Sequence, residues 1–285
     1  MSVTSLTEVE NQVEHYWSPV FTKQLRESLL LGSLVNKEYE GEIKRQGDRV
    51  RVSQVNAPDG QLLTVGVDAD SFASEAVSTS YVDIVADRRA VASYEFQDLA
   101  ELQSQIGREN PEIMAALNHA VAKQINDYLY SLVSPSTSAP DHSISGVTDF
   151  NASQLSAARI LAAQAKWPKD GRWYCLADPV YMGDILNAAT LTSSDYGASD
   201  APVIAGQVAM KRFGFNILED DSRTADQALL FHPDFLHLAM QTQAQVRISD
   251  LHAQKKFGVV MSVDLVFGAK LGINGNVKHI KVYNS

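Results

Sequence analysis

Asp68 and Asp70 are spaced like the first two ligands of a calcium-binding loop, which makes them the first candidates for chemistry in this 285-residue sequence. Such a loop needs a glycine at its sixth position and a bidentate glutamate at its twelfth. Ala73 and Thr79 occupy those positions here. We therefore interpret the stretch as an acidic turn and expect no metal site there.

The other residues that could bind a metal or act as nucleophiles are equally poorly placed. His232 and His237 are five residues apart across a break between predicted strands, which favours core or surface histidines over a zinc pair. The run Glu219-Asp220-Asp221 is interpreted as a solvated loop. Cys175 is the only cysteine and stands in the apolar run 173–177, so we expect a buried, unreactive thiol.

Sequence motifs for phosphate binding or hydrolysis are also missing. Gly268-Ala269-Lys270 has neither the preceding glycines nor the following Ser or Thr of a phosphate-binding loop. The sequence contains no G-x-S-x-G and no H-E-x-x-H. We expect no cofactor, no metal and no enzymatic activity, with a dispersed active site as the remaining alternative.

The composition is that of a globular protein with an acidic surface. Hydrophobic residues make up 45% and charged residues 20%, and the net charge of −10 argues against general binding to DNA phosphates. No run of 18 apolar residues and no secretory signal pattern is present, so we expect a protein kept in a cytosol.

The charge is distributed unevenly along the chain. Residues 41–56 have a net charge of +2, residues 57–87 a net charge of −6, and residues 251–285 a net charge of +4. We interpret these charged segments as solvent-exposed faces of the protein. The alternative is that they form patches of opposite charge through which copies of the chain associate.

A long helix is the element around which the rest must pack. Apolar residues recur at helical spacing from Phe96 to Val133, and Asn110-Pro111 is a favourable restart point, because Asn caps helices and Pro fits the first helical position. From Pro111 to Val133 such a helix spans about 35 Å at 1.5 Å per residue. The predicted apolar stripe consists of Leu99, Leu102, Ile106, Ile113, Leu117, Val121, Ile125, Tyr128 and Leu132.

Two segments before this helix need covering partners. Residues 8–34 form a predicted amphipathic arm that includes Trp17 and Phe21. Residues 40–92 predict a long β-hairpin, because alternation at 49–53 is followed by the turn signal Pro58-Asp59-Gly60. Isolated hairpins are marginally stable, so we expect both segments to pack on the body or on another subunit.

The second half of the chain alternates between helices and strands. A helix is predicted at 151–166, with Leu155, Ile160 and Leu161 as its apolar residues, and another at 179–187. Residues 134–149 and 190–202 are predicted loops. Strands are predicted at 172–177, 206–218 (a pair), 228–231, 236–240, 257–271 and 277–283.

The order of these features resembles the major capsid proteins of tailed bacteriophages, which have the Hong Kong-type capsid fold. The resemblance covers nearly the whole chain and depends on the order and spacing of short motifs. These are Tyr39-Glu40-Gly41-Glu42-Ile43, Gln46-Gly47-Asp48-Arg49-Val50, Ile125-Asn126-Asp127-Tyr128-Leu129, Gly171 to Pro179, Gly206-Gln207-Val208, Phe213 to Ile217, and Val266 to Lys270.

The resemblance implies an α+β fold with an N-terminal arm, an extended β-hairpin loop, a long spine helix, a peripheral domain and an axial domain. The corresponding boundaries are 1–38 for the arm, 39–92 for the extended loop, 93–150 for the spine helix with the peripheral domain, 151–249 for the axial domain, and 250–285 for the C-terminal strands of the peripheral domain.

The implied function is that of a structural major capsid protein. It would form hexamers and pentamers of an icosahedral head around double-stranded DNA, in a virion assembled in the host bacterial cytoplasm. Implied partners are other copies of the chain, a separate scaffolding protein, a portal and a decoration protein, with no membrane. The alternatives are an encapsulin-type shell around a protein cargo, an α+β enzyme, and a tail or other virion protein.

Specific intersubunit contacts follow as hypotheses. Arg49 and Arg51 on the extended loop would meet an acidic surface of the next subunit around Asp68 and Asp70. Such exposed pairs would set register and angle more than affinity. The remaining contact residues are Pro58, Asp59 and Gly60 on the loop, and Trp17 and Phe21 on the arm.

Overall fold

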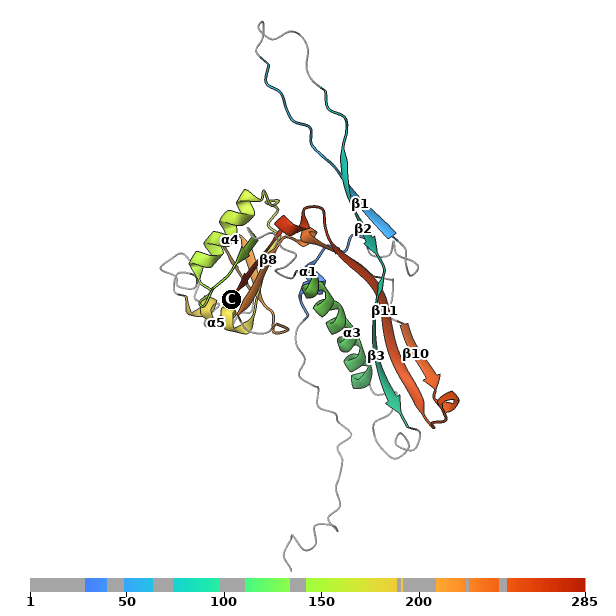
Figure 1. Cartoon of the computed structure of the whole chain (residues 1–285). Helices are drawn as coiled ribbons and strands as arrows, with labels where there is room; N and C mark the ends of the chain where they lie inside the picture. Colours follow the sequence, from blue (N-terminus) through green and yellow to red (C-terminus); the bar gives the residue numbers. More distant parts are fainter. Residues whose placement is uncertain are drawn as a thin grey trace, which may run out of the picture.

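The computed structural model describes residues 29–39, 49–63, 74–97, 111–133, 142–188, 191, 209–223, 226–240 and 245–284. In these ranges the chain forms an α/β domain, a four-stranded sheet packed on a long helix, and a two-stranded ribbon that projects away from both (Figure 1). None of the helices in the described ranges is long and apolar enough to cross a membrane.

The α/β domain is built on a six-stranded sheet with the order β4-β12-β8-β5-β7-β6. Its strands are β4 (Ser143–Ile144), β5 (Trp173–Ala177), β6 (Ala209–Arg212), β7 (Phe215–Glu219), β8 (Gln227–Phe231) and β12 (His279–Tyr283). The pairs β5–β7 and β12–β4 are parallel and the other pairs are antiparallel.

Two capped helices cover one face of this sheet. Helix α4 (Ala152–Gln164) begins with a capping box in which Asn151 and Gln154 each accept a backbone hydrogen bond. Helix α5 (Pro179–Asn187) has Asp178 as N-cap and Pro at its first position. Both helices confirm the predicted elements; of the apolar residues named for α4, Leu155 is buried and Ile160 is exposed.

The side-chain alternation of the strands gives the sheet two buried faces. Trp173 and Cys175 of β5 pack with α4 and α5, whereas Tyr174 and Leu176 point to the opposite face. That second face packs against helix α3 (Pro111–Leu132) and against the four-stranded sheet, and these parts share a second hydrophobic core. The α/β domain is therefore joined to the long helix through shared apolar contacts.

The long helix begins at Pro111, as predicted, and runs as α3 (Pro111–Leu132). Of the predicted stripe, Leu117, Val121 and Ile125 are buried, and Leu129 joins them. Ile113, Tyr128 and Leu132 are half-buried against the same core. A short helix, α1 (Leu31–Leu34), packs on α3 and contributes the buried Leu31.

The four-stranded sheet lies against α3. It consists of β3 (Arg88–Phe96), β9 (Leu236–Met240), β10 (Gln245–Asp250) and β11 (Val259–Leu271). The 13-residue strand β11 pairs with β3 on one side, and with β10 and then β9 along the other. The end of β11 reaches the start of β9, where Leu271 pairs with Leu236.

Several sequence predictions need correction. Phe96 does not begin the spine helix but ends β3, where it pairs with Val259; Leu99, Leu102 and Ile106 lie outside the described residues. Residues 143–144 form a strand in a predicted loop, and β10 was not predicted.

Sheet membership also crosses the predicted boundary at 249/250. Strand β12 belongs to the six-stranded sheet, whereas β9 and β10 pair with β11. The reason is that the chain crosses from the four-stranded sheet to the six-stranded sheet between β11 and β12. The pattern of residues within a strand does not say which sheet the strand joins.

Candidate assembly surfaces

The ribbon is the element with the least support from its own chain. Strand β1 (Arg49–Val55) pairs antiparallel with β2 (Thr79–Val85), with Arg49 opposite Val85 and Val55 opposite Thr79. Hydrogen bonds continue one pair further, from the backbone N–H of Asn56 to the carbonyl of Ser78 (3.0 Å). The ribbon projects well beyond the rest of the molecule (Figure 1).

The base of the ribbon is anchored in the fold. Val50 and Ile84 form a small core with Ala86 and Ala239. Strand β11 passes so close to the end of β2 that a Cβ at Gly268 would overlap the Val85 carbonyl. The base is therefore fixed by packing.

The outer part of the ribbon has apolar side chains that are exposed to solvent. Leu62 is fully exposed, Val77 is 82% exposed and Val55 is 66% exposed. Tyr81 and Leu63 are exposed as well. The predicted turn residues 58–60 are also exposed. Apolar residues clustered on an exposed surface mark an interaction site more often than single ones do.

One of the two predicted contact arginines already has a partner in its own ribbon. Arg51 Nε lies 2.7 Å from Asp83 Oδ1 and Arg51 Nη2 lies 2.9 Å from Asp83 Oδ2, while the guanidinium covers the ring of Tyr81 at 4.2 Å. The hydrogen bond from Arg51 lowers the pKa of Asp83. Asp68 and Asp70, the predicted partners, lie outside the described residues, so the predicted contact with a neighbour stays a prediction.

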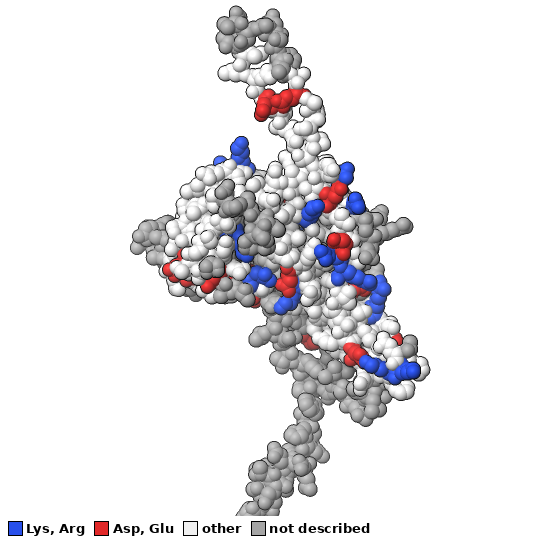
Figure 2. Space-filling view, in the orientation of Figure 1, with Lys and Arg blue, Asp and Glu red and all other residues white. Residues whose placement is uncertain are grey.

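The outer ribbon has an acidic patch, whereas acidic and basic side chains are mixed on the ribbon base and the four-stranded sheet. Asp59 and Glu75 lie close together on the outer ribbon, where the Asp59 N–H donates to the Glu75 carboxylate (3.4 Å). Figure 2 shows this acidic patch high on the ribbon and several basic side chains along the side of the four-stranded sheet. The self-complementary patches of opposite charge considered above therefore stay a prediction.

The solvent-facing side of the four-stranded sheet has a three-strand ion cluster. Asp264 on β11, with a side chain only 7% exposed, accepts from Arg89 Nε (2.8 Å) and Nη2 (2.5 Å) of β3. Arg247 Nε of β10 lies 3.2 Å from the other oxygen of the same carboxylate. One carboxylate thus links all three strands.

A second group of exposed apolar residues lies on the same sheet, at the end away from the α/β domain. Val246 and Ile248 on β10 are about half exposed, and Tyr94 on β3 is nearly so. Phe257, in the loop between β10 and β11, is 77% exposed. In the described part of the chain, β10 pairs with a strand on one side only.

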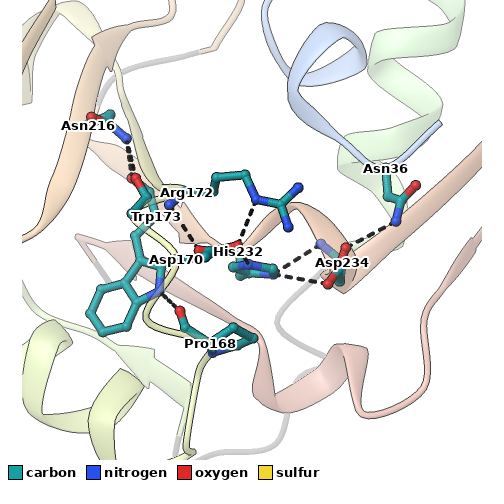
Figure 3. Close-up of polar contacts among 9 residues, drawn as sticks. Asn36, Pro168, Asp170, Arg172, Trp173, Asn216, His232 and Asp234 are labelled. Carbon is teal, nitrogen blue, oxygen red and sulfur yellow. Dashed lines mark hydrogen bonds and ion pairs between the residues drawn. The ribbon is translucent and has the colours of Figure 1, made fainter. Parts of the chain in front are cut away.

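A polar network around the buried His232 fixes Asn36, near the end of the predicted arm (Figure 3). Asn36 donates through Nδ2 to Asp234 (3.0 Å), and its own N–H reaches the carbonyls of residues 233 and 236. His232 is fully buried; its Nδ1 accepts from the Asp234 N–H (3.3 Å), which leaves Nε2 to donate to Asp170 (3.1 Å). Arg172 Nε completes the network at 2.6 Å from Asp170.

The electrostatics of this network favour a charged carboxylate. Burial opposes ionisation of Asp170, but the hydrogen bonds from Arg172 and His232 outweigh it and lower the pKa of the carboxyl group. His237, the second histidine considered as a metal ligand, is also buried, lies edge-on to Tyr39, and has its pKa lowered by burial. Both are core histidines.

The acidic run at 219–221 differs from its prediction as a solvated loop. Asp220 is 1% exposed and accepts hydrogen bonds from the Tyr130 hydroxyl of α3 and from the Ser222 N–H. Burial and the adjacent Asp220 raise the pKa of Tyr130, which keeps its proton available for donation. Cys175 is buried, as predicted, and burial raises its pKa.

Sequence reasoning found the ribbon but missed its exposed apolar residues and those of β10. Their signal was present as Leu62, Leu63 and Val77 within an otherwise polar hairpin. The arm residues Trp17 and Phe21 lie outside the described residues.

Comparisons with known proteins agree on one fold. A family model described as phage capsid protein matches residues 81–282. No curated protein matches the chain. Solved structures that are similar include those of Mycobacterium phage Che8 (TM-score 0.76, 19% identity, 95% of this chain and 96% of that one), the capsid of the cyanophage P-SCSP1u (0.74, 15%, 97% and 94%) and the capsid asymmetric unit of the cyanophage Pam1 (0.69, 12%, 100% and 99%).

Proposed function

The chain belongs to the phage capsid protein family, and we propose that its copies associate into the hexamers and pentamers of an icosahedral head enclosing double-stranded DNA. It is a major capsid protein, a structural component of the virion. The structural observation that supports assembly is the ribbon, whose outer apolar side chains are exposed in the single chain.

Covering the ribbon gives a physical reason for association. Full burial of a Leu or Val side chain contributes about 1.5–3 kcal/mol. Leu62, Val77 and Val55 are largely exposed in the single chain, so each can contribute when a neighbour covers it. A shell repeats this contact in every copy, and many modest contacts add up to an assembly that no single contact could hold.

The two sheets can be assigned to the domains of a capsid protein under the same proposal. The six-stranded sheet with α4 and α5 would be the axial domain, and the four-stranded sheet with α3 the peripheral domain. The Asn36 network would then fix the point at which the arm leaves the body. We also propose that Trp17 and Phe21 of the arm, and Arg49 of the ribbon, contact neighbouring copies.

Partners and contents complete the proposal. Head assembly would use a separate scaffolding protein, a portal and a decoration protein in the host bacterial cytoplasm. The net charge of −10 suits a wall that confines DNA without binding its phosphates tightly. The match to a phage capsid family does not favour an encapsulin-type shell. Because capsid proteins are structural, it also supports our proposal that the chain has no enzymatic activity and no cofactor.

The test is a chain with a shortened ribbon. Because Asn56 pairs with Ser78, residues 57–77 can be replaced by Asn-Gly, which closes a two-residue hairpin at that point. We expect the wild-type chain, with its scaffold, to form closed particles in electron microscopy and the shortened chain to fold but remain as small oligomers. Circular dichroism of both chains is the control for folding.

Two outcomes bear on the alternatives. Closed particles formed equally well without the ribbon would contradict its role in assembly. Native particles that contain a protein cargo in place of nucleic acid would favour the encapsulin-type function.

A further inference from the structure

We propose that a cavity between the end of α3 and the six-stranded sheet is a binding site for a small oxyanion of the phosphate type. The cavity has a volume of about 50 Å³. Its polar lining comes from Tyr130, Arg223, Gln227 and Lys281, and apolar side chains such as Val133 and Leu176 close it.

Lys281 places an uncompensated positive charge at this cavity. It pairs with Leu229 across β12 and β8, and thus shares the sheet face that packs against α3. In the described part of the chain, no carboxylate pairs with its ammonium group, whose contact is the Tyr283 ring at 5.6 Å. Burial and the nearby Arg223 both lower the pKa of Lys281, as expected for a cation that lacks an anionic partner.

Arg223 is held in position and has one buried nitrogen without a hydrogen-bond partner. Its Nη2 donates to Asp127 on α3 (2.9 Å), and its guanidinium lies over the Tyr130 ring at 4.0 Å. Its Nε is buried and has no hydrogen-bond partner. An unsatisfied buried donor is costly, and an anion in the cavity would satisfy it.

The remaining polar groups around the cavity fit an anion better than a cation. Among the residues that the structure describes, none of those lining it is acidic. The nearby Asp220 is engaged by the Tyr130 hydroxyl and the Ser222 N–H. Two cationic residues and Gln227 therefore line a space that exceeds what one water molecule needs, and their donors suit the several acceptor oxygens of a tetrahedral oxyanion.

An oxyanion in this position would connect the long helix to the α/β domain. Arg223 is bound to α3 through Asp127, and Lys281 stands on β12. An ion shared by the two residues would fix how the helix lies against the sheet. It would thus stabilise one position of α3 relative to the α/β domain. The geometry of a shell depends on how these two parts of each copy are arranged.

The test is calorimetric titration of the purified full-length chain with inorganic phosphate at pH 7.5, at constant ionic strength set by sodium chloride. We expect saturable binding and a rise in melting temperature with phosphate and with sulfate, but not with chloride. Lys281→Gln should weaken phosphate binding at least tenfold. Lys270→Gln, an exposed strand lysine on β11, is the matched control and should bind as the wild type does.

Two results would overturn the proposal. One is a wild-type chain that shows no saturable phosphate binding beyond its response to chloride, an outcome that needs no variant and stands even if Lys281→Gln fails to fold. The other is equal phosphate affinity in Lys281→Gln and Lys270→Gln. The site lies in the protomer, so the chain with the shortened ribbon should keep it; loss of assembly and loss of phosphate binding are therefore separable.

Discussion

Replacing Asp264 with asparagine removes the one negative charge that links β3, β11 and β10. The substitution preserves the shape of the side chain, which is 7% exposed, and leaves Arg89 and Arg247 facing a neutral group. Arg89 loses the charged acceptor for both of its hydrogen bonds, at 2.8 and 2.5 Å, and Arg247 loses its ion pair at 3.2 Å.

The size of the effect follows from the burial of each partner. Removing one partner of a buried ion pair costs about 3–5 kcal/mol. The two arginines are 45% and 58% exposed, so water screens the charges and solvates the guanidinium groups after the substitution. We therefore expect Asp264→Asn to lower the free energy of unfolding by about 1–3 kcal/mol.

Urea unfolding of the unassembled chain, followed by circular dichroism, measures this change. Arg89→Ala should cost more than Arg247→Ala, because Arg89 makes two hydrogen bonds to the carboxylate and Arg247 is farther from it. Asp83→Asn, on the exposed ribbon, is the matched control and should have little effect. An Asp264→Asn chain as stable as the wild type, or a larger loss for Arg247→Ala than for Arg89→Ala, would show that the Asp264 carboxylate does not hold the three strands together.

Three further predictions concern packing, pH and assembly. Gly268→Ala would drive a methyl group into the backbone carbonyl at the end of β2 and should destabilise the chain by about 2 kcal/mol or more in urea unfolding, whereas Gly60→Ala, with open space around it, should be neutral. Burial lowers the pKa of His279 below 6.5, so the unfolded chain takes up the proton first on acidification. The melting temperature should therefore fall between pH 7.5 and 5.5, with a smaller slope in His279→Gln. Leu62→Ser combined with Val77→Ser should leave the protomer's melting temperature unchanged, because both side chains are exposed, yet raise the concentration needed for particle formation at least tenfold in sedimentation.

The elements with strong local signals could be predicted from the sequence. Helix α3 starts at Pro111, a residue that fits the first helical position, and α5 matches its prediction with Asp178 as cap and Pro179 after it. The turn signal at 58–60 lies on the ribbon that the alternation at 49–53 predicts. In each case the deciding interactions are between residues close in the sequence.

The parts that were missed depend on contacts between distant residues. Phe96 fits a helical pattern, yet it extends β3 because Val259 offers a strand partner. Asp220 has the composition of a solvated loop, and its burial follows from Tyr130, some 90 residues earlier. The Arg51 contact with Asp83 likewise requires the register of β1 and β2, which the sequence of either strand alone does not set.

Hydrogen exchange of residues 56–63 and 74–78, compared between dissociated chains and closed particles, measures whether neighbouring copies cover the outer ribbon. We expect fast exchange in the single chain, where these residues form no ladder beyond the Asn56–Ser78 pair, and strong protection once a neighbouring copy covers them. Equal exchange rates in the two states would show that the outer ribbon gains nothing from its neighbours and would contradict the proposed basis of assembly.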